Sequence, residues 1–278
     1  MSTMVFMKGN EAIGEAAIRS GVMAYYGYPI TPQNELTAYM AKNMREKGRV
    51  FIQTESEITA INAVFGSSCA GFRAMTSSAS TAMSLKQEGI SHLAYLEIPA
   101  VIVDMMRGGP GLGNILATQN DYNQAVKGGG TGDYHTIVLA PNSVQEAADL
   151  TRLAFELSDK YRNPAMILAD GTIGQMVELV EFPEPIDPAD IPERDYALTG
   201  NRGRAPRKAE PKNSAEDLEN HNLHLQEKYH ACESAERRSE SVYTEDADVV
   251  VVAFGFVSRI AREMVEELRQ DGVKAGLF

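Results

Sequence analysis

The feature that most constrains this fold is the alternation of short apolar runs with segments of helical periodicity across residues 5–181. The run at 99–106 (PAVIVDMM) is apolar at almost every position, which is typical of a strand buried on both faces of a parallel sheet. Strands that alternate with helices predict a parallel-sheet α/β domain. We expect strands at 50–52, 73–76, 99–106, 138–140 and 165–169, and helices at 10–25, 34–47, 56–70, 80–96 and 143–161.

A proline-bracketed turn occupies residues 28–33, which read YPITPQ. Proline fixes φ and disfavours helical backbone for the residue before it, so Pro29 and Pro32 predict a rigid extended turn. Such a turn can hold the Thr31 hydroxyl and nearby backbone groups at a fixed point. Packing alone also explains many Pro-x-x-Pro segments, which are often simply turns.

A second polar segment, QTESE at 53–57, ends the predicted strand at 50–52 and opens a helix of small and apolar residues. A strand end that runs into a helix start is where α/β proteins place ligand chemistry. Glu55 and Glu57 are both candidates for such a role. The structural alternative is an acid in the first helical turn, where the helix dipole favours negative charge.

Arg107 directly follows the apolar strand at 99–106 and is followed by a glycine-rich run, GGPGLG, at 108–113. An arginine presents a planar fork that binds a carboxylate through two hydrogen bonds. Glycines behind it would let a ligand approach the backbone closely. The structural alternative is an ion pair between Arg107 and an acid of the protein itself.

Composition excludes several classes of function. The net charge of −12 argues against binding to duplex nucleic acid, and no apolar run reaches the roughly 18 residues of a membrane span. We expect a cytoplasmic protein. Its two cysteines, Cys69 and Cys232, cannot supply the four thiolates of a usual iron–sulfur cluster. Its five histidines show no metal-binding pattern. Ala169-Asp170-Gly171 has alanine in place of the first glycine of Gly-Asp-Gly, a motif that can hold Mg²⁺ through oxygen ligands. We therefore expect no metal site.

The chain is expected to divide into three parts. Residues 1–181 form the first α/β domain, and residues 182–246 form a linker with a charged helical arm, rich in Gly, Pro, Arg and Lys at 199–212. Residues 247–278 begin a second α/β domain, with an apolar strand at 249–254 and a helix at 258–269. About 30 residues cannot complete a doubly wound sheet, so we expect this domain to be incomplete at Phe278.

Taken together, YPITP at 28–32, SE at 56–57, MTSS at 75–78 and RGGPG at 107–111 resemble the 2-oxoacid:ferredoxin oxidoreductases, which use thiamine diphosphate. The chain is most similar to the alpha-type subunit, which carries the pyrimidine-binding domain, of the branched-chain enzyme that acts on 3-methyl-2-oxobutanoate. The resemblance implies a transketolase C-terminal-like domain after residue 247.

The resemblance also implies roles for individual residues. Glu57 falls on the glutamate that activates the cofactor through its pyrimidine ring, with Glu55 as the competitor two residues earlier. Pro29 and Ile30 match positions that contact the cofactor in the family. Thr31 and Arg107 match the residues that bind the substrate carboxylate.

The partners that the resemblance implies are a beta-type subunit that holds the diphosphate and Mg²⁺, and gamma and ferredoxin-like delta subunits that carry 4Fe–4S clusters. The implied reaction oxidatively decarboxylates the 2-oxoacid to acyl-CoA with coenzyme A and passes electrons to ferredoxin. Two alternatives stay open: the same chemistry on 2-oxoglutarate, and a non-catalytic scaffold subunit of such a complex.

Overall fold

The computed structural model describes residues 3–200, 212 and 214–278, and its centre is a six-stranded sheet in the order β3-β2-β4-β5-β7-β6. Every pairing between neighbouring strands of this sheet is parallel, which confirms the predicted parallel-sheet α/β class. The strands are β2 (Ala24–Gly27), β3 (Val50–Gln53), β4 (Ala74–Ser78), β5 (Ala100–Met106), β6 (Ile137–Leu139) and β7 (Pro164–Asp170).

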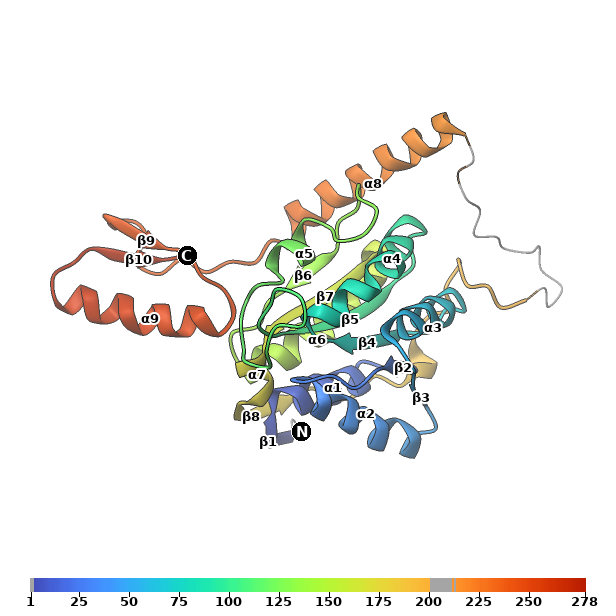
Figure 1. The fold of residues 1–278 in the computed structure, drawn as a ribbon, viewed down its shortest axis with the longest axis horizontal. Helices are drawn as coiled ribbons and strands as arrows, with labels where there is room; N and C mark the ends of the chain where they lie inside the picture. Colours follow the sequence, from blue (N-terminus) through green and yellow to red (C-terminus); the bar gives the residue numbers. More distant parts are fainter. Residues whose placement is uncertain (1–2, 201–211, 213) are drawn as a thin grey trace.

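Helices cover both faces of this sheet (Figure 1). Alternate residues of β5 point to opposite faces, so Val101 and Val103 lie in one cluster of buried apolar side chains and Ile102 lies in the other. The first cluster packs under α1 (Gly9–Arg19), α2 (Asn34–Glu46) and α6 (Val144–Tyr161), and the second under α3 (Glu57–Cys69), α4 (Ser80–Tyr95) and α5 (Tyr122–Val126).

The predicted helix at 10–25 is wrong in its second half. Helix α1 ends at Arg19, and the chain turns through Gly21, whose φ of 77° favours glycine. Residues 24–27 then form β2, which lies between β3 and β4 in the sheet. The apolar residues of this segment therefore belong to two elements, and a single helical period was the wrong reading of them.

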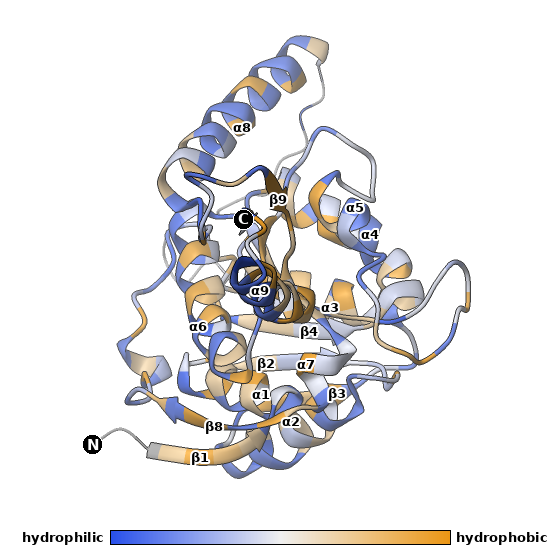
Figure 2. Cartoon of the chain, turned by 90° about the vertical axis from the view of Figure 1, so that its left-hand side faces the viewer, coloured by the Kyte–Doolittle hydropathy of each residue, from blue (hydrophilic) through white to orange (hydrophobic). Residues whose placement is uncertain are grey.

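A two-stranded antiparallel ribbon, absent from the predicted elements, joins β1 (Thr3–Lys8) to β8 (Val177–Phe182). Figure 2 shows these strands side by side and largely hydrophobic. Val180 and Phe182 are buried against α1 and α6, whereas Phe6 on the other face is 72% exposed. The short helix α7 (Gly171–Gln175) connects β7 to this ribbon.

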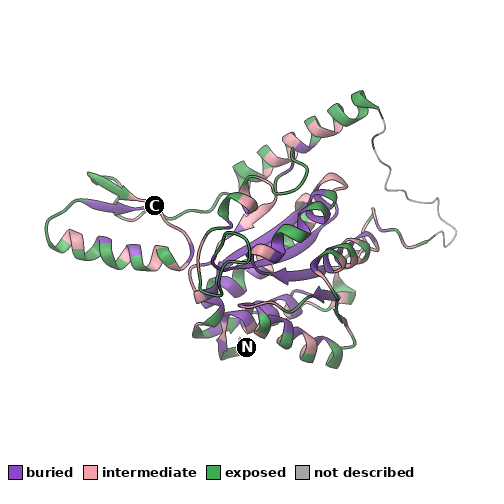
Figure 3. Cartoon of the chain, in the orientation of Figure 1, coloured by how far each residue is buried: buried purple, intermediate pink, exposed green. Residues whose placement is uncertain are grey.

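The C-terminal third lies outside the main sheet. After the 3₁₀ turn η1 (Pro188–Asp190), the helix α8 (Ala215–Glu236) extends as a mostly exposed arm (Figures 1 and 3). The predicted linker residues 201–211 lie outside the described part of the chain. Strands β9 (Val249–Val251) and β10 (Ala275–Leu277) pair in parallel, with α9 (Gly255–Gln270) between them and a small apolar core of their own.

Within the described residues, no helix has the length and apolar character needed to cross a bilayer.

Candidate active site

The sheet topology brings three predicted site residues to one edge. Thr31 lies in the loop after β2, Glu57 begins the helix after β3, and Arg107 follows β5. The carboxyl ends of parallel strands meet at the same edge of a sheet. Strand β2 is flanked by β3 on one side and β4 on the other, so the chain changes direction across the sheet here. Open α/β sheets bind ligands in the crevice at such a switch point.

Buried hydrogen bonds hold the turn at 28–33 in place. The fully buried Gln33 accepts from Thr37 Oγ1 at 2.9 Å and from Ser77 Oγ at 2.5 Å, and its Nε2 donates to Tyr28 O at 3.2 Å. On the other side, Asn10 Nδ2 donates to Pro32 O at 2.8 Å. The turn is thus tied to β4, α2 and α1. Pro29 is exposed and Ile30 is half-buried, so both are available to a ligand.

Arg107 and Thr31 are in direct contact. Arg107 Nη1 donates to Thr31 O at 3.1 Å, and Nη2 donates to Leu112 O at 3.1 Å. The Thr31 hydroxyl accepts from Asn34 Nδ2 at 3.2 Å. Arg107 is 7% exposed, its Nε has no partner, and it forms no ion pair with any described residue. The structural alternative, an arginine paired with an acid of the protein itself, therefore does not hold among the described residues.

Glu57 and Glu55 occupy different environments. Ser56 caps α3 by accepting from Thr59 N at 3.3 Å, which places Glu57 in the first turn, where the helix dipole favours a carboxylate. Glu57 is 6% exposed, and no described residue forms a hydrogen bond or ion pair with its carboxyl group. Glu55 is exposed, and its bond from the Thr59 hydroxyl lowers the pKa of its carboxyl. Only Glu57 combines burial with a carboxyl group that lacks a partner.

The Glu57 side chain is buried and no described residue bonds to its carboxyl group, so its oxygens can accept a hydrogen bond from a ligand that brings a donor. The pyrimidine end of thiamine diphosphate supplies such a donor at its N1′ nitrogen when that nitrogen is protonated. The described residues therefore fit the pyrimidine end of the cofactor.

Two further polar groups were not predicted from the sequence. Ser80 Oγ accepts from Arg107 N at 2.8 Å and also contacts Asp121, while Ser80 N donates to Asp104 Oδ1 at 3.2 Å. Burial, with the nearby charge of Asp121, raises the pKa of Asp104 well above its ordinary value. This cluster fixes the backbone at the start of Arg107. The second missed group is the buried Lys86, whose Nζ donates to Thr76 Oγ1 at 2.9 Å.

Asp170 acts as a structural anchor. Its Oδ1 accepts from Ile173 N at 3.1 Å and caps α7, and its Oδ2 accepts from Phe256 N at 2.9 Å at the start of α9. Both carboxylate oxygens are thus used within the protein. In the part of the chain that the structure covers, no three His, Cys, Asp or Glu side chains are grouped so as to hold a metal ion.

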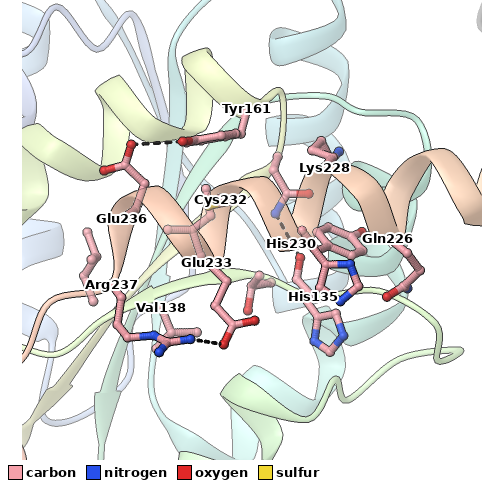
Figure 4. Close-up of a pocket in the computed structure, with 15 residues that line it drawn as sticks. His135, Val138, Tyr161, Gln226, Lys228, His230, Cys232, Glu233, Glu236 and Arg237 are labelled. Atoms are coloured by element: carbon pink, nitrogen blue, oxygen red, sulfur yellow. Dashed lines mark hydrogen bonds and ion pairs between the residues drawn. The ribbon is translucent and has the colours of Figure 1, made fainter.

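One cavity in the described part of the chain is separate from this edge. Figure 4 shows it between β6 and α8, with a volume of about 320 Å³ and with His135, Tyr161 and Cys232 in its lining. Thr31, Glu57 and Arg107 do not line it. Two other histidines hold the arm: His221 Nε2 lies 2.7 Å from Tyr95 O, and His224 Nε2 lies 3.1 Å from Glu97 Oε1.

Comparison with known proteins gives a consistent family. The family model described as "Pyruvate flavodoxin/ferredoxin oxidoreductase, thiamine diP-bdg" matches residues 15–244. Over 279 residues the chain is 51% identical to the ketoisovalerate oxidoreductase subunit VorB of Methanothermobacter marburgensis, covering 98% of this chain and 77% of that protein. It is 34% identical over 303 residues to the 2-oxoglutarate synthase subunit KorA of Methanothermobacter thermautotrophicus, covering 99% of this chain and 80% of that protein.

A solved structure has a similar fold. The 2-oxoglutarate:ferredoxin oxidoreductase from Magnetococcus marinus, with 2-oxoglutarate, coenzyme A and succinyl-CoA bound, matches with a TM-score of 0.85 and 27% identity. The match covers 99% of this chain and 53% of that chain, so this protein spans about half the length of the solved one.

Proposed function

This chain belongs to the thiamine-diphosphate-binding family of the pyruvate flavodoxin/ferredoxin oxidoreductases, and from that premise we propose that it is the alpha-type subunit of a branched-chain 2-oxoacid:ferredoxin oxidoreductase. The proposed reaction is oxidative decarboxylation of 3-methyl-2-oxobutanoate to acyl-CoA with reduction of ferredoxin. The 51% identity to a ketoisovalerate oxidoreductase subunit supports this substrate, because the identity to the 2-oxoglutarate subunit compared above is 34%.

The buried, unpartnered carboxyl group of Glu57 carries the proposal. Thiamine diphosphate, when bound, would supply the carbon nucleophile that this chemistry needs. The Glu57 carboxylate would accept a hydrogen bond from the pyrimidine N1′ nitrogen and share that proton with it, and Pro29 and Ile30 would contact the cofactor. These assignments rest on the burial of Glu57 and on the exposure of the turn beside it.

Arg107 and Thr31 orient the substrate. The guanidinium group of Arg107 has no acid partner among the described residues, so a substrate carboxylate would supply the missing negative charge. The Thr31 hydroxyl adds one directed hydrogen bond. Because Arg107 already contacts the backbone of Thr31, the two groups can act on the same carboxylate.

The remaining parts of the machinery are assigned to partners. A beta-type subunit holds the diphosphate and Mg²⁺, while gamma and delta subunits carry the 4Fe–4S clusters and pass electrons to ferredoxin. Cys69 and Cys232 are separate single cysteines, which fits clusters on other chains. Residues 1–181 then serve the pyrimidine end, residues 182–246 form the arm, and the complex works in the cytoplasm and is active only when assembled.

Turnover of the assembled enzyme with Glu57→Gln separates an enzyme subunit from a scaffold. Glutamine keeps the shape of the side chain but cannot hold the shared proton, so ferredoxin reduction should fall by on the order of a hundredfold or more. Turnover close to that of the unmodified enzyme would support the scaffold alternative.

Steady-state kinetics of the same complex with a panel of 2-oxoacids test the alternative that its substrate is 2-oxoglutarate. We expect a higher kcat/KM for 3-methyl-2-oxobutanoate, because the second carboxylate of 2-oxoglutarate needs an additional cation to bind it. A preference for 2-oxoglutarate would overturn the substrate assignment and leave the reaction class intact.

A further inference from the structure

Lys86 is a fully buried lysine in the second turn of α4. Its side chain is 0% exposed, and its single hydrogen bond among the described residues is from Nζ to Thr76 Oγ1 on β4. An ammonium group carries three N–H donors, and a neutral hydroxyl satisfies one of them. Lys86 makes no ion pair within the described residues. Its charge is therefore removed from water without direct compensation.

Glu57 is the acid that acts on Lys86. Burial lowers the pKa of Lys86 to about 7, and the charge of Glu57 across the α3–α4 contact opposes this shift. Of the other titratable groups nearby, Asp104 on β5 interacts with Asp121, and Glu88 and His92 on α4 are exposed. Thr76 on β4 is neutral. The electrostatic partner of Lys86 is thus the same carboxyl group that the proposed function places at the cofactor.

A lysine at this position carries a cost that an apolar residue would avoid. Removing an ammonium from water is energetically costly, and apolar side chains of similar volume often replace buried charges without loss of stability. Titratable groups perturbed by burial beside a specific charge gather at functional sites. Packing alone does not account for a charged group here, whereas an effect on Glu57 does.

We propose that Lys86 is a positioning residue for the cofactor-activating carboxyl group, and that its ammonium keeps Glu57 in the carboxylate form once water is excluded from the site. A cation behind the carboxylate keeps the shared proton off Glu57, which favours its residence on the cofactor nitrogen. The inference rests on the proposed function, since it assumes that Glu57 meets the cofactor.

The first test measures the protonation of the Glu57 carboxyl group directly and does not depend on enzyme activity. Infrared difference spectra of the assembled, cofactor-free enzyme are recorded against pH, and the Glu57 band is assigned by its loss in Glu57→Gln. With Lys86→Met the midpoint of this band should move upward by about one to three pH units, the usual effect of losing a nearby opposite charge. An unchanged midpoint would overturn the proposal.

The second test is a double-mutant cycle on thiamine diphosphate affinity, measured by calorimetry on the same complex. Lys86→Met should weaken binding at least about tenfold in the native background and have no further effect in the Glu57→Gln background. The matched control is Lys228→Met, which removes a largely buried lysine that pairs with Glu97 under α8, and it should leave affinity unchanged. Equal losses from Lys86→Met in both backgrounds would mean that Lys86 does not act through Glu57.

The proposed function and the role of Lys86 can be disproved separately. If Glu57→Gln leaves affinity and turnover unchanged, the proposed function is wrong. If Glu57→Gln is severe and Lys86→Met resembles the unmodified enzyme, only the role of Lys86 is wrong. Should Lys86→Met fail to fold, Thr76→Val removes the one hydrogen bond of the ammonium and should move the Glu57 midpoint in the same direction by a smaller amount; no movement would count against the proposal.

Discussion

Arg107 and Glu57 share one condition: each is buried, and neither meets an opposite charge at ion-pair distance within the described residues. The sequence predicted both because each follows a strand, and strand ends in parallel sheets carry ligand chemistry. Lys86 could not be predicted in this way. Its burial depends on the close approach of α3 to α4, where Gly89 lies against Ile61 so tightly that a Cβ would come within 2.6 Å of an Ile61 methyl carbon. No local pattern marks such a contact.

At the scale of single residues, Arg107→Ala should mainly weaken substrate binding. Losing a hydrogen bond to a charged group typically removes about 1.5–3 kcal/mol, so the KM for the 2-oxoacid should rise on the order of tenfold to a hundredfold. Arg107→Lys keeps the charge and loses the planar fork, so its KM should lie between those of the unmodified enzyme and Arg107→Ala. Steady-state kinetics of the assembled enzyme would measure this, and an unchanged KM would remove Arg107 from the substrate site.

The burial of Lys86 should also make the free energy of unfolding depend on pH. Its pKa is about 7 in the folded protein against an ordinary value of 10.5, so the unfolded chain binds more protons between these limits. The lysine therefore contributes a stability cost that is full below about pH 7 and is relieved as pH rises, by about 1.4 kcal/mol per pH unit. The difference in unfolding free energy between Lys86→Met and the unmodified protein should shrink from pH 7 to pH 10. A difference independent of pH would contradict this burial argument.

Individual elements were predicted unevenly. The helix predicted at 143–161 appears as α6, and Ser143 Oγ caps its first turn by accepting from Glu146 N at 3.0 Å. The ribbon of β1 and β8 was missed because its strands pair across about 170 residues of chain, and no short-range signal records that pairing. The docking of α9 on Asp170 was missed for the same reason.

The junction between α9 and the main sheet gives a prediction at this scale. Gly255 has a φ of 62°, and a Cβ there would lie 2.8 Å from Gln119 Nε2 and 3.0 Å from Asp170 Oδ2. Gly255→Ala should thus lower the midpoint of thermal unfolding and increase proteolysis near residue 250. The control is Gly272→Ala, which has a φ of 85° but nothing within 4 Å, so it isolates backbone strain. Equal effects from the two variants would mean that the contact with Asp170 is unimportant.

At the scale of the whole molecule, strand and helix alternation was sufficient to predict the parallel sheet, and the family resemblance carried by four short motifs is confirmed. What the sequence could not supply is the set of distances between loops after different strands. The contact between Arg107 and Thr31 exists because β2 and β5 end at the same edge of one sheet, a property of topology that no single motif contains.

The long arm is likewise a property of the whole molecule. Lys160 Nζ and Tyr161 Oη both bond to Glu236 at the end of α8, at 2.7 and 3.0 Å, and Lys228 pairs with Glu97 nearer its middle. The charged face predicted for this segment therefore serves partly to hold it on the sheet domain, and most of the remaining surface is exposed.

The most direct measurement is a structure of the assembled enzyme with thiamine diphosphate bound. The account predicts a carboxylate oxygen of Glu57 within about 2.6–3.2 Å of the pyrimidine N1′ nitrogen, with Arg107 and Thr31 facing the reactive carbon from the adjoining loops. A structure in which Glu55 makes that contact, or in which the Glu57 side chain lies outside the cofactor crevice, would contradict it.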